Sequence, residues 1–336
     1  MAPPPARFLV LRFSAIGDLL LTAPALATLR SACHGPCEIH LLVRAPYAEV
    51  AAGFGPLVDQ IHTFDRTTAE ALPALKSLDF NYVIDLQGNV RSRRVCRALG
   101  VLTFRVNKMN WAKWLLIRGF RTPPISHIVD RYTEAFAAFG AVPPTVWPTL
   151  FPPQTQTQTP TQTQTPTQTQ TSICLGAAHP GKRIPPSTLR AVAEALVRGG
   201  HRVVLLGGPD DRDVAEFVAE GLDVENRAGT TDIAGSAAVL RASEAALVAD
   251  TGMMHLAAAV GTRTVAVWGC TRPSLGMAAW QPAPGSVDLL PEGRSPRPCS
   301  KLGNRCRYGR PDGPEGCTHQ VSPERILRAL LSQTAP

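Results

Sequence analysis

The stretch "DTGMMH", residues 250–255, places a carboxylate, a hydroxyl, a glycine and a histidine within six positions. Its first residue ends the run 245–250, which predicts a buried strand, and the following residues open a helix-forming run. Gly252 lets the backbone approach a ligand closely, and free N–H groups at a helix start bind phosphate. The Thr251 hydroxyl and His255, one helical turn later, project from the same face. The stretch predicts a phosphate or diphosphate site, although a capped helix beside a satisfied histidine would contain the same residues.

Two further sets of charged residues follow predicted strands in this half of the chain. Lys182 and Arg183, in "HPGKRIP", carry two cations that could neutralise a diphosphate, or they lie in an ordinary solvated loop. Asp211 and Asp213, in "LLGGPDDRD", superficially resemble a metal-binding pair, and Asp210 lies directly before them. Asp210 or Asp211 is better explained as the N-cap of the helix that follows, and we predict no metal ligand here.

Asp18 follows the first predicted strand and a small-residue loop, in "LRFSAIGDLLLTAPAL". An acidic residue in the first turn of a helix complements the helix dipole, which is the simplest explanation. The loop lacks the glycine pattern of a dinucleotide site, and a carboxylate there would repel a phosphate. Asp18 could instead accept a proton from a bound hydroxyl group.

A long basic stretch follows the predicted strand 82–86. From Leu86 to Val129 the chain has nine Lys or Arg residues and no Asp or Glu, with Trp111 and Trp114 among them. A solvated basic face, nucleic-acid binding, and contact with an anionic acceptor or membrane surface all fit this composition. We favour the third, because no nucleic-acid-binding motif accompanies the charge. Acceptor binding is assigned to the first polar residues of the stretch: Gln87, Asn89, Arg91 and Arg93.

Short apolar runs alternate with helix-forming runs in both halves of the chain, which is typical of parallel strands covered on both faces. We expect strands at 8–13, 38–43, 82–86, 172–176, 202–208, 245–250 and 264–269. Helices are expected at 18–29 and at 187–200, the second with Ser187 as N-cap. The segment 154–171, of Thr, Gln and Pro, has no apolar residue to bury and predicts a linker. The sequence thus predicts two doubly wound domains, 1–153 and 172–336, facing each other across a cleft.

Composition limits the classes of partner and compartment. The net charge of the 336-residue chain is +8, which favours acidic partners. No apolar run is long enough to span a bilayer, and we expect a cytoplasmic protein. The cysteines are too sparse for a disulfide scaffold. Cys299, Cys306 and Cys317, with His319, could bind zinc, but the spacing is not a standard one, and we favour structural or free thiols.

Taken together, these segments resemble glycosyltransferase family 9, the heptosyltransferase family of lipopolysaccharide core synthesis. The resemblance extends over nearly the whole chain and includes "YVIDLQGNVRSR", "AGTTDIAG" and a C-terminal "CTHQVSPERIL" besides the stretches above. It implies a GT-B fold, with the acceptor on the N-terminal Rossmann-like domain and the nucleotide sugar on the C-terminal one. It also implies an inverting transfer that needs no metal or cofactor.

The resemblance assigns roles to individual residues and to partners. Asp18 matches the proposed catalytic base, and Lys182 matches a lysine that contacts the donor phosphates. The donor-binding loop is matched by Asp250, Thr251, Gly252 and His255, and Asp210 or Asp211 lies where a carboxylate can hold the donor ribose. The implied partners are ADP-heptose and an anionic glycolipid or oligosaccharide acceptor, with peripheral contact to the inner membrane surface and no nucleic acid.

The chain departs from the family pattern beside the lysine. Ala177 and Ala178 stand where members often carry Ser or Thr hydroxyls, and Ile184 replaces a frequent aromatic residue. Without these hydroxyls the chain has fewer side chains that could donate hydrogen bonds to the donor phosphates. A non-catalytic nucleotide-sugar-binding protein of the same fold is therefore the first alternative. A nucleotide-sugar epimerase is the second, and a nucleic-acid binder the third.

Overall fold

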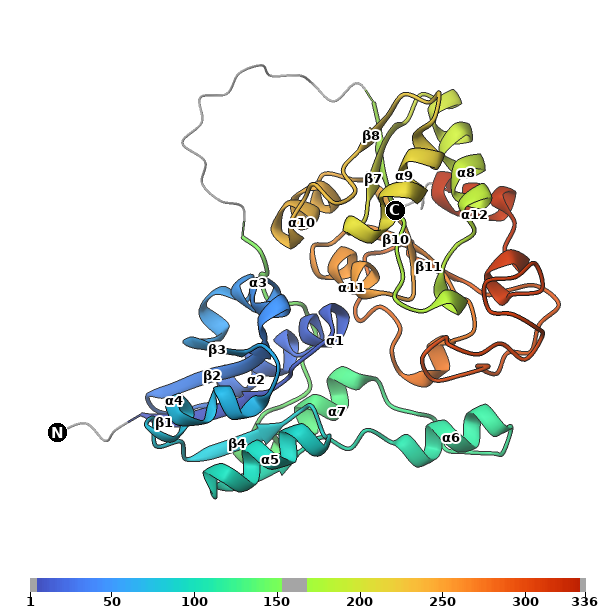
Figure 1. The fold of residues 1–336 in the computed structure, drawn as a ribbon. Coiled ribbons are helices and arrows are strands. Elements are labelled where there is room, and N and C mark those ends of the chain that lie inside the picture. The colour runs from blue at the N-terminus through green and yellow to red at the C-terminus, as the bar shows by residue number, and fades with distance from the viewer. Residues whose placement is uncertain (1–4, 153–167, 333–336) are drawn as a thin grey trace, which may run out of the picture. The chain divides into compact units, whose positions relative to one another are not determined.

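A computed structural model describes residues 5–152 and 168–332 of the chain. These residues form two compact units, each with its own parallel sheet (Figure 1). Unit 1 comprises Met1–Asn110 and Ser126–Phe151, and unit 2 comprises Trp111–Ile125 and Pro152–Pro336. No helix in the described ranges is both long and apolar enough to cross a membrane. Most of the predicted linker 154–171 lies outside the described residues.

Unit 1 is built on a five-stranded parallel sheet with the order β3-β2-β1-β4-β5. Its strands are β1 Ala6–Leu11, β2 Cys37–Arg44, β3 Gln60–Phe64, β4 Tyr82–Asp85 and β5 Leu102–Arg105. The α-helices are α1 Ile16–Leu20, α2 Ala23–Ala32, α3 Ala48–Ala52, α4 Leu72–Lys76, α5 Val90–Leu99 and α7 Ile128–Glu134. Leu9 and Leu11 of β1 pack with Leu75 of α4 and Val95 of α5, which covers one face of the sheet.

The single helix predicted at 18–29 is wrong, because the chain forms two helices there. Helix α1 ends at Leu20, and α2 begins at Ala23 with Pro24 in its first turn. Proline has no N–H to donate into a preceding helical turn, so it sits best near the start of a new helix. The break leaves α1 as a short helix with Asp18 in its first turn.

Unit 2 is built on a six-stranded parallel sheet with the order β11-β10-β9-β6-β7-β8. Its strands are β6 Gln170–Cys174, β7 Arg202–Leu206, β8 Val224–Asn226, β9 Ala245–Ala249, β10 Arg263–Val267 and β11 Val287–Leu289. Its helices are α6 Asn110–Arg118 (whose first residue is assigned to unit 1), α8 Pro186–Arg198, α9 Arg212–Ala219, α10 Ile233–Arg241, α11 Gly252–Ala259 and α12 Pro323–Leu331.

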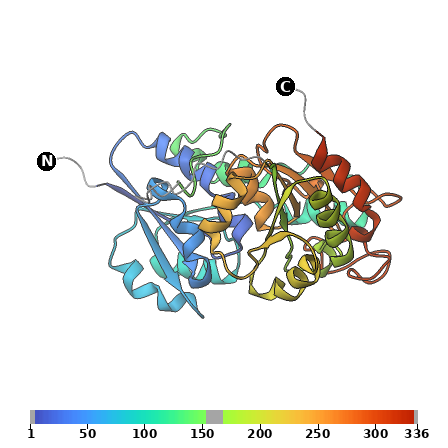
Figure 2. The same cartoon turned by 90° about the horizontal axis from the view of Figure 1, so that it is seen from above.

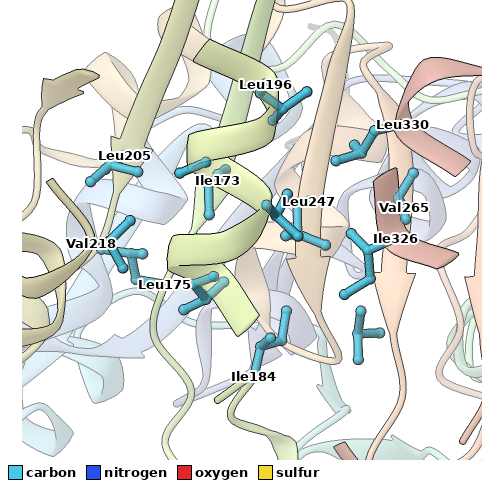
Figure 3. Close-up of a cluster of buried hydrophobic side chains, with 14 of the residues drawn as sticks. Ile173, Leu175, Ile184, Leu196, Leu205, Val218, Leu247, Val265, Ile326 and Leu330 are labelled. Carbon is cyan, nitrogen blue, oxygen red and sulfur yellow. The ribbon is translucent and has the colours of Figure 1, made fainter. Parts of the chain in front are cut away.

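Apolar side chains from the strands and from three helices form the core on one face of the second sheet. Figure 3 shows Ile173, Leu205 and Leu247 of the sheet beside Leu196 of α8 and Ile326 of α12, all of them buried. Helix α11 lies on the other face, and the turned view in Figure 2 separates it from α12. Full cover on both faces explains why these strands are apolar without alternation.

Two predicted boundaries in unit 2 differ from the structure. Strand β6 begins at Gln170, so the predicted linker 154–171 extends two residues too far. Thr171 is buried and pairs with Val203 in the sheet, so this threonine is not solvated as the low-complexity pattern predicts. The N-cap of α8 is Pro185 rather than Ser187, because Pro186 already has the backbone angle of a first helical residue.

The segment Trp111–Ile125 belongs to unit 2, although the sequence predicted it within domain 1–153. The Arg307 guanidinium donates a hydrogen bond to the carbonyl of Ile117 at 3.2 Å, and Gly119 lies against Arg297. The basic stretch 86–129 is thus divided. Its early residues lie in unit 1, and both of its tryptophans lie in unit 2.

Candidate active site

The residues predicted to bind the donor follow neighbouring strands of the second sheet. Because all these strands are parallel, their carboxyl ends meet at one edge. Lys182 comes after β6, and Asp250 comes directly after β9, the strand that pairs with β6. The Lys182 ammonium lies 2.7 Å from the Asp250 carboxylate, and both side chains are largely buried. Two residues 68 positions apart are thereby brought into one ion pair.

Thr271 is a third member of this cluster, and the sequence analysis missed it. It follows β10, on the other side of β9, and its hydroxyl donates to the Asp250 carboxylate at 2.7 Å. Both donors reach the same carboxylate oxygen, Oδ2. Asp250 is therefore a fixed anchor that positions the lysine and the loop after β10.

Helix α11 begins beside this carboxylate. Thr251 is its N-cap residue in extended conformation, but no side-chain hydrogen bond caps the helix. The Thr251 hydroxyl is buried and has no hydrogen-bond partner among the described residues. The first N–H groups of a helix also lack partners within the helix. His255 is buried one turn later. The Thr251 hydroxyl and the first N–H groups of α11 therefore lie together at the helix start, as an anion site requires.

The two aspartates after β7 differ in their surroundings. The Asp211 carboxylate accepts a hydrogen bond from the Gly208 N–H at 2.8 Å and packs on the backbone of Gly176. A Cβ at Gly176 would collide with it, so the contact requires glycine. Asp210 is exposed, and no hydrogen bond or ion pair of its carboxylate is found among the described residues. Asp211 thus holds the loop, whereas Asp210 is available to a ligand.

Asp18 in unit 1 lies in an ion pair that the sequence did not predict. The Arg12 guanidinium contacts its carboxylate at 2.5 Å and also donates to the carbonyls of Ser14 and Leu86. Burial disfavours the charged guanidinium and is the largest single effect on its pKa. Asp18, together with Tyr132 and Asp85, outweighs burial, and the pKa of Arg12 is raised. The Asp18 side chain keeps 30% of its surface exposed, so a hydroxyl group can reach it.

Tyr132 of α7 completes the surroundings of this ion pair. Its ring lies 5.7 Å from the Arg12 guanidinium carbon and is fully buried. Burial raises the pKa of the Tyr132 phenol, which stays protonated at neutral pH. The arrangement fixes Arg12 from several sides, and Arg12 in turn orients the carboxylate.

The residues assigned to acceptor binding have different environments. Gln87 is buried, and its side-chain oxygen accepts a hydrogen bond from the Phe13 N–H at 2.9 Å. Asn89 caps helix α5 by accepting from the Ser92 N–H at 3.0 Å. Arg91 and Arg93 are exposed on α5. These contacts hold the loop after β4, and the acceptor role of the four residues stays a prediction.

Two doubly wound parallel domains, with a helix start suited to an anion at the carboxyl edge of the second sheet, have the architecture of GT-B glycosyltransferases. The sequence profile of glycosyltransferase family 9 (heptosyltransferase) matches residues 70–299. The chain belongs to this family, which confirms the resemblance and the assignment to glycosyl transfer.

Individual relatives agree with the family assignment. Over 286 residues the chain is 26% identical to lipopolysaccharide heptosyltransferase 1 of Pseudomonas aeruginosa, covering 80% of this chain and 79% of that protein. Over a shorter match of 107 residues the chain is 34% identical to lipooligosaccharide heptosyltransferase 2 of Haemophilus influenzae. This match covers 30% of this chain and 31% of that protein.

Solved structures confirm the fold. The E. coli ADP-heptose lipopolysaccharide heptosyltransferase II has a TM-score of 0.69 at 19% identity, covering 96% of this chain and 97% of that chain. The E. coli heptosyltransferase WaaC, solved with ADP, has a TM-score of 0.67 at 20% identity, covering 96% and 98%. At these identities the likeness concerns the fold alone.

Proposed function

We propose that this protein transfers heptose from ADP-heptose to a lipopolysaccharide core-type acceptor, with inversion at the anomeric carbon and without a catalytic metal. The cluster of Lys182, Asp250 and Thr251 at the start of α11 carries the proposal, because it presents a cation, a hydroxyl and free N–H groups at one edge. This set suits a nucleoside diphosphate. The E. coli relative holds ADP, and we extend that nucleotide to this chain.

The reaction is a single displacement. The Asp18 carboxylate takes the proton from an acceptor hydroxyl, and the resulting oxygen attacks the anomeric carbon of the donor. The bond between that carbon and the diphosphate oxygen breaks, and ADP leaves with the electron pair. Lys182 and the N-terminus of α11 stabilise the charge that develops on the diphosphate. Arg12 pairs with the Asp18 carboxylate and keeps it in position.

The different surroundings of the two aspartates after β7 favour Asp210 as the ligand of the donor ribose. Its exposed carboxylate can accept hydrogen bonds from the two ribose hydroxyls, whereas Asp211 already binds the Gly208 N–H. Ala177 and Ala178 contribute no hydroxyl to the diphosphate, and the Ala177 carbonyl accepts from Arg183 at 2.9 Å. The donor affinity of this chain then depends mainly on Lys182 and Thr251.

An exposed aromatic surface on and beside helix α6 suits the lipid part of the acceptor. We call Trp111, Trp114 and Phe120 the α6 aromatic surface; their exposed fractions are 69%, 42% and 58%. The two indole rings stack at 4.9 Å, and the Arg118 guanidinium lies 5.2 Å from the Trp114 ring. Aromatic rings beside cations bind at the headgroup level of an anionic bilayer. Vesicles of anionic phospholipid should pull down the parent protein and not a Trp111→Ser, Trp114→Ser variant.

The substitution Asp18→Asn tests the proposed mechanism. Loss of a general base costs about 10²- to 10⁴-fold in turnover, while the affinity for ADP-heptose should stay unchanged. The matched control is Asp65→Asn, which alters an exposed carboxylate in the same unit. Turnover is measured as ADP release and as glycosylated inner-core product by mass spectrometry. NMR assigns the new anomer, and assays with and without added Mg²⁺ or Mn²⁺ test whether a divalent cation raises turnover.

Each alternative function predicts a different result in the same assays. Parental turnover in Asp18→Asn would contradict the assignment of the base. Tight nucleotide-sugar binding without transfer or hydrolysis would identify a non-catalytic binding protein. A changed sugar in the absence of any acceptor would identify an epimerase. Salt-sensitive binding to arbitrary DNA duplexes would favour a nucleic-acid binder.

A further inference from the structure

Four cysteines from three separate parts of unit 2 converge at one point. Cys270 follows strand β10, Cys299 and Cys306 lie in the long loop after β11, and Cys317 opens the short 3-10 turn Cys317–Gln320. Their four sulfur atoms lie within 4.8 Å of one another. Cys270 and Cys317 are fully buried, and the other two are partly exposed. The sequence analysis grouped three of these residues but missed Cys270, 29 positions before Cys299.

The distances fit a shared metal ion better than a disulfide. Four thiolates around one Zn²⁺, with Zn–S bonds of about 2.3 Å, lie about 3.8 Å apart at the corners of a tetrahedron. The Cys306 and Cys317 sulfurs are 4.0 Å apart. A disulfide would bring two sulfurs to about 2.05 Å. All four cysteines have free thiols, so the cluster is a set of four separate ligands.

The loop that carries Cys299 and Cys306 lacks the apolar side chains that would hold it in place. Between the end of β11 at Leu289 and the turn at Cys317 the chain forms no helix or strand. None of the Leu residues within 290–316 is buried, and this stretch contains no Val, Ile, Met or Phe. A segment of this length without a hydrophobic core of its own is uncommon in a compact domain. Metal binding is a source of folding free energy for a segment that buries few apolar side chains.

We propose that Cys270, Cys299, Cys306 and Cys317 bind one structural transition-metal ion in a closed tetrahedral site, with Zn²⁺ the preferred ion. The four thiols lose their protons on binding, and the four thiolates leave no open position for water or substrate. The metal therefore takes no part in glycosyl transfer.

The proposed site is linked to the loop that carries Lys182. The Cys270 N–H donates to the Gly181 carbonyl at 2.8 Å, and the Gly181 N–H donates to the Gly303 carbonyl at 2.9 Å. The Cys299 N–H donates back to the Cys270 carbonyl at 2.7 Å. A Cβ on Gly181 would lie 2.7 Å from the Cys270 sulfur, so cluster and loop are in direct contact. The proposed metal ion thus holds the loop with Lys182 in place. The effect of this support on donor binding rests on the proposed function.

Metal content of the purified full-length protein tests the proposal directly. Protein purified under reducing conditions from cells grown with zinc should contain one metal ion per chain, as measured by inductively coupled plasma mass spectrometry. Substitution with Co²⁺ should give the visible bands of a tetrahedral site and the near-ultraviolet bands of thiolate–cobalt charge transfer. Iron at the same stoichiometry would support the four-thiolate site, because this donor set suits both ions.

Variants identify the ligands. Cys306→Ser, at a partly exposed ligand, should lose the bound metal and lower the melting temperature, whereas Cys33→Ser, at a partly exposed cysteine outside the cluster, should keep one ion per chain. If Cys306→Ser does not fold, thiol counting on the parent protein replaces it. The four cluster thiols should become reactive to a thiol reagent when a chelator removes the metal, whereas Cys96 and Cys174, which are buried outside the cluster, should resist the reagent throughout.

Three results would overturn the proposal: parent protein free of metal with the four cluster thiols reactive, disulfides among the four cysteines after non-reducing digestion, or full metal content in Cys306→Ser. Each of these readouts is independent of catalysis. If glycosyl transfer is absent while the metal is present, the proposed function fails and the metal site stands. The link between the two is tested by ADP affinity, which should fall when the metal is removed.

Discussion

Replacing Lys182 by methionine separates two roles of one side chain, in the fold and in donor binding. The substitution keeps most of the unbranched side chain, one atom shorter, and removes its charge. In the absence of ligand the Lys182 ammonium pairs with Asp250 at 2.7 Å, and the two side chains are 18% and 8% exposed. Without Lys182 the Asp250 carboxylate keeps only the Thr271 hydroxyl as a described side-chain partner. We expect a loss of about 1–3 kcal/mol in the free energy of unfolding.

The same substitution should weaken the binding of ADP. A hydrogen bond between an ammonium and a phosphate oxygen contributes about 1.5–3 kcal/mol, which corresponds to roughly a 10- to 150-fold higher Kd. The Lys182 ammonium also pairs with Asp250, which weakens its attraction to the ligand phosphates. We therefore expect the lower part of this range. Isothermal titration calorimetry with ADP measures the change, and thermal denaturation without ligand measures stability. Arg183→Met is the control, since its side chain is exposed and donates to the Ala177 carbonyl.

The double variant Lys182→Met, Asp250→Asn distinguishes direct contact from an effect through the fold. Asparagine removes the unpaired buried charge while its oxygen still accepts from Thr271, so thermal stability should recover. ADP affinity should stay low, because the cation is still missing. Recovery of affinity together with stability would mean that Lys182 acts only by shaping the loop. An ADP Kd within twofold of the parent in Lys182→Met would refute the contact altogether.

Three further predictions follow from single contacts. Thr251→Val should raise the ADP Kd about 2- to 10-fold in calorimetry without lowering the melting temperature, because the hydroxyl is buried without a described partner; a lower melting temperature would contradict this. Burial and the neighbouring His40 hold the pKa of His62 at about 4. Unfolded His62 binds a proton from about pH 6.5 downward, so the free energy of unfolding should fall, by about 1 kcal/mol after solvent screening, as the pH drops from 6.5 to 4. Urea denaturation at pH 5 and pH 7 should show a smaller difference in His62→Phe than in the parent, and an equal difference would exclude His62 as its source. Gly181→Ala should lower stability by about 1–3 kcal/mol and weaken ADP binding, because its Cβ has no room between the lysine loop and the cysteine cluster; Gly35→Ala, with nothing within 4 Å, is the control, and equal melting temperatures would contradict the reasoning.

Local sequence patterns predicted the parts of the fold and of the site that depend on neighbouring residues. The run 245–249 is strand β9, and helix α11 begins at Gly252, directly after Thr251. Both follow from apolar runs, glycine and capping preferences within a few residues. The two-domain α/β architecture follows from the repetition of such patterns along the chain.

Contacts between residues distant in the sequence were not predictable in the same way. Arg12 lies only six positions from Asp18, yet in the sequence it interrupts an apolar strand and gives no sign of a buried ion pair. Thr271 joins Asp250 because β10 lies beside β9, and strand order is not a property of either strand alone. Cys270 shows the same limit, since its spacing from Cys299 matches no standard metal motif.

Because α6 lies between β5 and α7 in the sequence but belongs to unit 2, the protein is not divisible at its low-complexity segment. A fragment that starts at residue 168 would lack Trp111–Ile125 and would leave Arg307 without its carbonyl partner at Ile117. Chimeras that exchange donor-binding halves between family members would therefore need to carry this insertion with the C-terminal half. A graft made at the low-complexity segment alone would combine helix α6 of one parent with the loop that carries Arg307 from another.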